Sequence, residues 1–226
     1  MTRTASELVA ETVADLAPDP AMNPLVPRIA DGTADLAAVT ALALEQWQVI
    51  PADRRSFAHL AARSTGADAE CAPFFVTLAE GESLAHERLG PLLAACGTST
   101  KEALAYEPMA GCQAYPAYVS WLALNADPAD AILALTANFS AWGGYCATIA
   151  TALRTHYGFA DEGCAFFDFF AAPAPDLDRQ ALAAVDAGLE RGRVTRAAAR
   201  RHGRLLQAYE GMFWETLANS EPSKGH

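Results

Sequence analysis

The first residue whose surroundings suggest chemistry is Glu210, close to the C-terminus. At helical spacing it shares one stripe with Leu206, Phe213, Trp214 and Leu217, which are all apolar. A carboxylate on such a stripe is directed toward a core, where its burial is costly unless the group is paired, hydrogen-bonded or protonated. Glu210 is therefore either a paired core carboxylate or a functional acid or base.

A second set of polar side chains could share a site with Glu210. Gln46, Tyr115 and Asn138 each lie among large apolar residues on a predicted helix. Each is either a core residue satisfied by a neighbouring helix or a group that orients a ligand or a water molecule. Small-molecule sites are mostly apolar with few polar groups, so aromatic side chains would form the walls. The candidates for those walls are Phe139, Trp142, Phe166 and Trp214.

Glu82 and His86 form the one pattern that could begin a metal site. They lie four residues apart on a predicted helix, and a metal would need further ligands from other helices. Segment 129–157 offers only His156 near its end, and segment 160–180 offers acids but no histidine. A polar pair at the helix surface or between helices is therefore favoured, and no metal or other cofactor is expected.

Composition places the chain among all-α proteins. It has 226 residues, of which 52% are hydrophobic, and it is rich in alanine and leucine with few β-branched runs. A net charge of −11 argues against a nucleic-acid partner, and the basic cluster at 191–204 fits the exposed face of a helix.

The cysteines and the N-terminal residues indicate the environment of the chain. None of the five cysteines forms a CxxC pair and their number is odd, which predicts reduced, buried thiols in a cytoplasmic protein. The early acids Glu7, Glu11 and Asp15 argue against a secretory signal peptide. No apolar run is long enough for a membrane span, so no membrane partner is expected.

Proline, glycine and Asn/Asp positions divide the chain into long helical segments. Pro51 is expected to end one helix and open the next, and a short aromatic segment at 166–170 is expected to precede a proline break. One helical domain over residues 1–226 is the economical organisation, with a disordered tail at 219–226. The predicted helices cover residues 5–16, 34–50, 52–65, 68–95, 108–124, 129–157, 176–190 and 194–218.

The stretch around Glu210 resembles a family signature. Tyr209-Glu210-Gly211-Met212-Phe213-Trp214-Glu215 is similar to the C-terminal Tyr-Glu-x-x-Phe-Trp-Asp signature of the TenA (thiaminase II-like) proteins. These proteins belong to the haem-oxygenase-like superfamily, which also holds the PqqC-like proteins. Weaker similarities in the same order are residues 23–33, the Glu82–His86 helix, Gly97 and Tyr115. The resemblance spans about residues 20–218 and implies a single bundle of seven to eight helices, a central pocket and a homodimer or homotetramer.

The chain departs from the family at its catalytic positions. The cysteine nucleophile of the family's pyrimidine hydrolases falls on Asn138, and an aspartate falls on Gln46. Two family tyrosines fall on Trp142 and about Phe166. Asparagine cannot form the covalent intermediate that a thiolate forms, so ordinary thiaminase II chemistry is not expected. Another residue would have to replace the nucleophile. The candidates are two cysteines at other positions, Cys112 and Cys146, and a second glutamate, Glu45.

The resemblance and the residues together predict a small-molecule enzyme of the TenA type. The expected substrate is a small nitrogenous metabolite, an aminopyrimidine or another planar heterocycle or an amide, hydrolysed at a C–N bond by acid/base chemistry without a metal. Glu210 would be the general acid or base, and Tyr115 and Gln46 would orient the ligand or water. The residues expected to bind the substrate are Asn138, Phe139, Trp142, Phe166 and Trp214.

Two alternatives remain open from the sequence. One is a protein that binds such a ligand without turnover, in a regulatory role. The other is an oxygen-dependent oxidase of the PqqC or di-iron type, which would use iron in its metal-dependent form. The stretch Gln46–Asp53 supports the second alternative, because it resembles a PqqC-like segment in which a helix ends with Ile50-Pro51.

Overall fold

The computed structural model describes residues 4–220, and within that range the chain is built of helices and loops without a strand. The all-α prediction is therefore confirmed. Of the tail predicted at 219–226, Asn219 ends the last helix and residues 221–226 lie outside the described part. The α-helices are α1 (Ala5–Leu16), α2 (Val26–Ala30), α3 (Leu36–Arg63), α4 (Ala72–Ala95), α5 (Thr100–Ala105), α6 (Ala110–Asn125), α7 (Pro128–His156), α8 (Asp161–Ala171), α9 (Pro175–Glu190) and α10 (Arg196–Asn219).

Several helices begin at capping side chains that can be recognised in the sequence. Asp35 accepts a hydrogen bond from the backbone N–H of Ala37 at the start of α3, and Asp127 accepts one from Ala129 at the start of α7. Pro128 follows Asp127 at the first helical position, where its missing N–H costs nothing. These caps account for the agreement between the predicted and observed starts of α3 and α7.

The prediction that Pro51 separates two helices is wrong. Helix α3 runs unbroken from Leu36 to Arg63 with Pro51 inside it. An internal proline costs about 3 kcal/mol. Ile50 on one side and Phe57 on the other are buried, and α3 packs along α4. Burial of a long apolar face of α3 offsets the cost of the proline. A rule based on the proline alone does not include this packing energy.

Two other differences concern short or weakly marked segments. The aromatic segment predicted at 166–170 is part of a longer helix, α8. The short helices α2 and α5 were not predicted at all, because segments of five or six residues carry too little periodicity to show a pattern.

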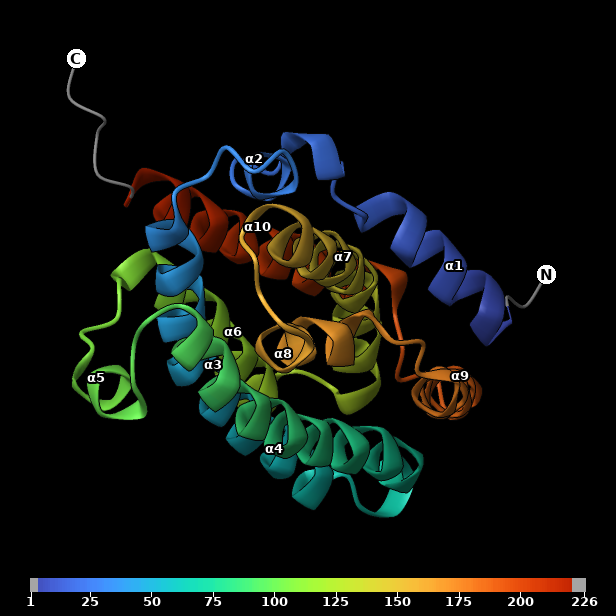
Figure 1. The fold of residues 1–226 in the computed structure, drawn as a ribbon. Coiled ribbons are helices and arrows are strands. Elements are labelled where there is room, and N and C mark those ends of the chain that lie inside the picture. Colours follow the sequence, from blue (N-terminus) through green and yellow to red (C-terminus); the bar gives the residue numbers. More distant parts are fainter. Residues whose placement is uncertain (1–3, 221–226) are drawn as a thin grey trace.

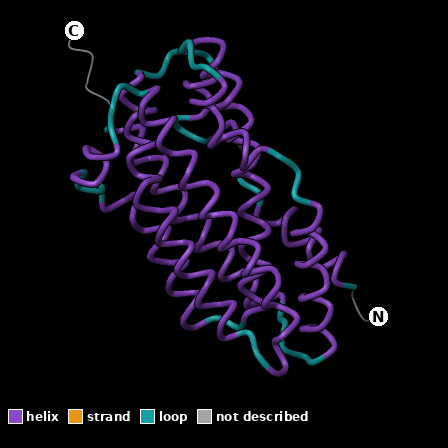
Figure 2. The backbone as a smooth tube through the Cα atoms, turned by 60° about the horizontal axis from the view of Figure 1, so that its bottom comes forward, coloured by secondary structure: helices purple, strands orange, loops and turns teal. Residues whose placement is uncertain are grey.

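Helix α7 is the central element of the bundle. Residues 131–135 are five consecutive buried positions, so at this level α7 has no exposed face. It contacts α1, α2, α8, α9 and α10, and Figure 1 shows it surrounded by them. Helices α3 and α4 lie side by side along one flank, and Figure 2 shows that the long helices follow one common direction.

The core consists of two apolar clusters at different levels of the bundle. One cluster gathers residues such as Leu42, Leu89 and Phe167, and the other gathers residues such as Phe57 and Ile132. Five helices pass from one cluster to the other, and each carries a polar residue at the crossing. We call these residues the polar layer: Asp53 of α3, Glu82 of α4, Tyr115 of α6, Asn138 of α7 and Glu210 of α10.

Two further sequence predictions concern the thiols and the membrane. All five cysteines are buried and carry free thiols, as predicted. Within residues 4–220, every helix is too short or too polar to cross a membrane.

Gly32 lies where the loop between α2 and α3 touches the end of α7, and its φ of 67° lies in the left-handed region. A Cβ there would lie 2.9 Å from the Cβ of His156, an atom fixed to the α7 backbone. Gly97 has a similar φ of 75° but open space around it. We expect Gly97→Ala to cost about 1 kcal/mol of unfolding free energy and Gly32→Ala about 1–3 kcal/mol more. Urea unfolding measures both, and equal costs would mean that the close approach to α7 is absent.

Candidate functional site

The polar layer faces one large cavity, which we call the central cavity. Its volume is about 1070 Å³, and residues from α1, α3, α4, α6, α7, α8, α9 and α10 line it. All five residues of the polar layer are among them. The structure thus brings six of the eight site residues expected from the sequence to one cavity: Gln46, Tyr115, Asn138, Phe139, Trp142 and Glu210.

Phe166 and Trp214, the other two expected residues, lie behind the wall of the cavity. Phe166 is fully buried and packs edge-on against Phe167 and Phe170. Because the segment is a helix, the cavity is lined instead by Phe169 and Phe170. Trp214 lies one helical turn after Glu210 and supports that residue rather than a ligand.

Both oxygens of the Glu210 carboxyl group are held by N–H donors. Asn138 donates from Nδ2 to Oε2, and the indole Nε1 of Trp214 donates to Oε1 at 3.2 Å. The hydroxyl of Tyr115 in turn donates to Oδ1 of Asn138 at 3.5 Å. The carboxyl group is therefore fixed in orientation at the cavity wall by residues from α7 and α10, and α6 fixes Asn138.

Burial dominates the acid/base properties of this group. It raises the pKa of Glu210 to about 7, against the opposing effect of the hydrogen bonds from Trp214 and Asn138. Burial also raises the pKa of Tyr115 well above its usual range, and the negative charges of Asp53, Glu210 and Glu82 act in the same direction. Tyr115 therefore keeps its proton near neutral pH, while Glu210 exchanges one.

Two carboxyl groups that the sequence analysis did not assign to the site lie in the same cavity. Asp53 is 4% exposed and Glu82 is 7% exposed. Oδ1 of Asp53 and Oε2 of Glu82 find no hydrogen-bond partner in the described structure. Burial raises the pKa of each well above its usual range, and for Glu82 the charge of Asp53 adds to the effect. Both groups therefore hold a proton more readily than a free carboxyl group does.

The sequence does contain a signal for both acids. Asp53 lies on a stripe with Ile50 and Phe57, and Glu82 lies on a stripe with Leu78 and Leu89. These are the same patterns, an acid at helical spacing among apolar residues, that single out Glu210. A helix that ends at Pro51 would not contain the first stripe. Glu82 also pairs with His86 at helical spacing, a pattern that indicates a polar pair rather than a cavity residue.

None of the residues considered as substitutes for the missing nucleophile lines the cavity. The carboxylate of Glu45 accepts hydrogen bonds at 2.7–3.0 Å from the Tyr106 hydroxyl, the Met109 backbone N–H and the Gln113 side chain, and so fastens the start of α6. The other two, Cys112 and Cys146, are fully buried, and burial is the main cause that raises the pKa of each thiol.

The side chains near Glu82 do not form a metal centre. His86 lies outside the cavity lining, and its ring packs on Trp47 with ring centroids 4.5 Å apart. Across residues 4–220, no group of three or more His, Cys, Asp or Glu side chains is arranged to hold a metal ion. The donor set therefore does not fit the iron that the oxidase alternative would use in its metal-dependent form. The helix end expected at Ile50-Pro51 is also absent, because α3 continues through it.

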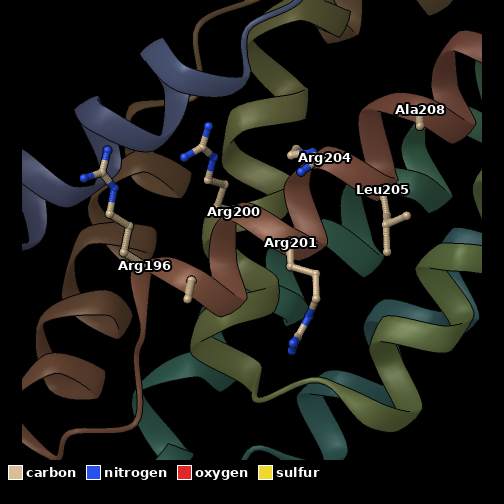
Figure 3. A pocket seen from close by; sticks show the side chains of 7 residues that line it. Arg196, Arg200, Arg201, Arg204, Leu205 and Ala208 are labelled. Carbon is tan, nitrogen blue, oxygen red and sulfur yellow. The ribbon is translucent and has the colours of Figure 1, made fainter.

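A second hollow, of about 890 Å³, lies on the surface of α10. Figure 3 shows that its arginines all come from this one helix and that they do not converge on a common point. Arg196 is already paired with Asp15, at 2.9 Å. This is the exposed basic helix face expected from residues 191–204, and it lacks the enclosed walls of the central cavity.

Comparison with known proteins places this geometry in a family. Residues 19–183 match the sequence model of the TENA/THI-4/PQQC family. That match includes four residues of the polar layer but ends before Glu210. A search of curated proteins finds no match.

Solved structures show the same fold over nearly the whole chain. A TenA homologue from P. horikoshii OT3 superposes with a TM-score of 0.75 at 15% identity, covering 97% of this chain and 100% of its own. A TenA homologue from Pseudomonas syringae pv. tomato DC3000 gives 0.74 at 14% identity, with 97% of both chains covered. A domain of unknown function with a haem-oxygenase-like fold from Shewanella denitrificans OS217 gives 0.66 at 16% identity, covering 98% of this chain and 96% of its own. The chain has the haem-oxygenase-like fold and belongs to the TENA/THI-4/PQQC family.

Proposed function

We propose that the protein is an enzyme that hydrolyses a C–N bond of a small nitrogenous metabolite, an aminopyrimidine or an amide, by acid/base chemistry. The observation that carries the proposal is Glu210, a carboxyl group held at a cavity wall with its pKa raised to about 7. A general acid/base works best when its pKa lies near the working pH, because both protonation states are then available. Membership of a largely enzymatic family supports the same conclusion.

Hydrolysis requires one proton to move from water to the leaving nitrogen. Ionised Glu210 takes a proton from a water molecule as the water oxygen forms a bond to the substrate carbon. The C–N bond then breaks, and Glu210 returns the proton to the departing amine. The carboxyl group ends in its starting state, and no covalent bond to the protein forms. This route is compatible with Asn138 at the position where the family's pyrimidine hydrolases carry a cysteine.

The remaining residues of the site position the reactants. The hydroxyl of Tyr115 and the amide of Gln46 line the cavity and orient the ligand or the water. Asn138 holds the carboxyl group, since its amide already bonds both Glu210 and Tyr115. Phe139 and Trp142 form walls against which a planar ring packs. A cytoplasmic location and the absence of a cofactor remain predictions from the sequence, and a homodimer or homotetramer remains an expectation from the family resemblance.

Replacement of Glu210 by Gln tests the proposal. We expect ammonia or amine release from a panel of aminopyrimidines and amides to fall at least about 100-fold, because the proton carrier is lost. Glu215→Gln, an exposed position five residues further along α10, is the matched control and should retain activity. Full activity in Glu210→Gln would contradict the role of this carboxyl group. If the wild-type protein binds the panel compounds without turning any over, the non-catalytic alternative replaces the proposal, and stoichiometric iron in the purified protein would favour the oxidase.

Replacement of Trp214 by Phe tests how the pKa of Glu210 is set. The change removes the N–H that bonds Oε1, so the ionised form loses a donor and the pKa rises further. The pH at which kcat/KM reaches half its maximum should move upward from about 7. Trp121→Phe, at a half-exposed position of α6 outside the cavity, should leave the profile in place. A profile of Trp214→Phe that coincides with wild type would show that the indole does not hold the carboxylate.

The pH dependence of stability provides a test that needs no substrate. The pKa of Glu210 is about 7 in the folded state and near 4.5 ordinarily, so the folded state holds this proton more tightly. The resulting stability is complete below about pH 4.5 and is lost as the pH rises through 7, by up to about 3 kcal/mol. Glu210→Gln cannot lose this proton, so its unfolding free energy in urea should fall less between pH 4.5 and pH 8. Parallel curves for the two proteins would contradict the raised pKa.

A further inference from the structure

Asp53 and Glu82 form an acidic pair deep in the central cavity. They come from neighbouring helices, α3 and α4, and the charge of one raises the pKa of the other. Both are more than nine-tenths buried, yet both line the cavity. Each has one carboxyl oxygen without a hydrogen-bond partner in the described structure. The pair is therefore enclosed by the fold, accessible from the cavity and incompletely bonded.

An incompletely bonded pair of this kind has no structural advantage. Burial of a carboxyl group without partners is unfavourable, and apolar residues of similar size would pack the same space at lower cost. The described residues that line the cavity include five acids but no lysine, arginine or histidine. No basic side chain of the cavity lining supplies a partner for the pair, and a ligand with positively charged N–H donors would supply one.

We infer that Asp53 and Glu82 bind a cationic nitrogen group, an ammonium or amidinium, of the molecule that occupies the central cavity. The inference rests on the proposed function in using the same cavity, and it adds the class of substrate: an organic cation with a planar apolar part. A cation gives the two unpartnered oxygens charge-assisted hydrogen bonds, and an amidinium can bond both at once.

The rest of the cavity fits such a ligand. The aromatic side chains of Phe74, Phe139 and Trp142 line the cavity and can pack against a planar ring or a cation. Asp178 lines the exposed mouth and places further negative charge on the path inward, whereas the neighbouring Asp176 is paired with Arg179 at 2.6 Å. Such a field attracts cations and repels anions. Tyr115 lines the same cavity as Asp53, Glu82 and Glu210, and after burial the charges of these three acids raise its pKa.

The test compares two probes of nearly identical shape, benzamidinium and neutral benzamide, by isothermal titration calorimetry on the full chain at neutral pH. We expect wild type to bind benzamidinium at least about tenfold more tightly, the effect of one charge-assisted hydrogen bond. Equal affinity for the two probes overturns the inference. Failure of benzamidinium to bind at millimolar concentration also overturns it, because the site would then not recognise a cation.

Two double variants test whether Asp53 and Glu82 cause the preference for benzamidinium over benzamide. In Asp53→Asn/Glu82→Gln, which copies the neutral shape of both groups, the preference for the cation should disappear while benzamide still binds. Asp186→Asn/Glu190→Gln removes the same two charges from exposed positions of α9 outside the cavity and should retain the preference. If both double variants lose the preference equally, the effect is general electrostatics and the inference is wrong. If Asp53→Asn/Glu82→Gln retains the preference for benzamidinium, the inference is wrong as well.

Glu210→Gln separates this inference from the proposed function. The variant should lose turnover but keep the preference for benzamidinium. If it keeps turnover, the proposed function fails while the cation site stands. If it loses the preference while Asp53→Asn/Glu82→Gln keeps it, the cation binds at Glu210 and the inference fails.

Discussion

The structure depends on the burial of three carboxyl groups at one level of a helical bundle without a basic side chain beside them. Asp53, Glu82 and Glu210 lie where α3, α4 and α10 pass from one apolar cluster to the other. All three side chains are buried at that level, so the charged form of each acid is disfavoured. The large apolar cores on both sides offset this cost and hold the helices in register. The fold therefore maintains acids that are protonated more easily than they are in water.

The three acids differ in how they are bonded, and that difference assigns them different tasks. Both oxygens of Glu210 are fixed by N–H donors from Asn138 and Trp214, which suits a group that must present a proton in one direction. Asp53 and Glu82 each keep an oxygen with no partner in the described chain, which suits groups that wait for a ligand. In the proposed function, the single cavity that these acids line combines a proton carrier with an acidic binding pair.

Much of the fold follows from local sequence rules, and the failures have physical causes. Caps such as Asp35 and Asp127 mark the helix starts, because they bond backbone groups only a few residues away. Pro51 misleads because the packing of α3 on α4 outweighs a local cost. The position of Phe166 relative to the cavity was not predictable without the phase of α8, which sets Phe169 and Phe170 toward it instead.

The site was only partly visible in the sequence for a related reason. Glu210 stands out because its stripe is otherwise apolar and no competing pattern surrounds it. Asp53 and Glu82 are on similar stripes, but the sequence alone does not show that α3 and α4 bring them to the same level.

The most direct measurement of the raised pKa of Glu210 is the carboxyl titration of ¹³C-glutamate-labelled protein by NMR, with Glu210→Gln to assign the signal. We predict that the Glu210 carboxyl group titrates with a pKa of about 7, and titration near 4.5 would contradict its role as a proton carrier near neutral pH.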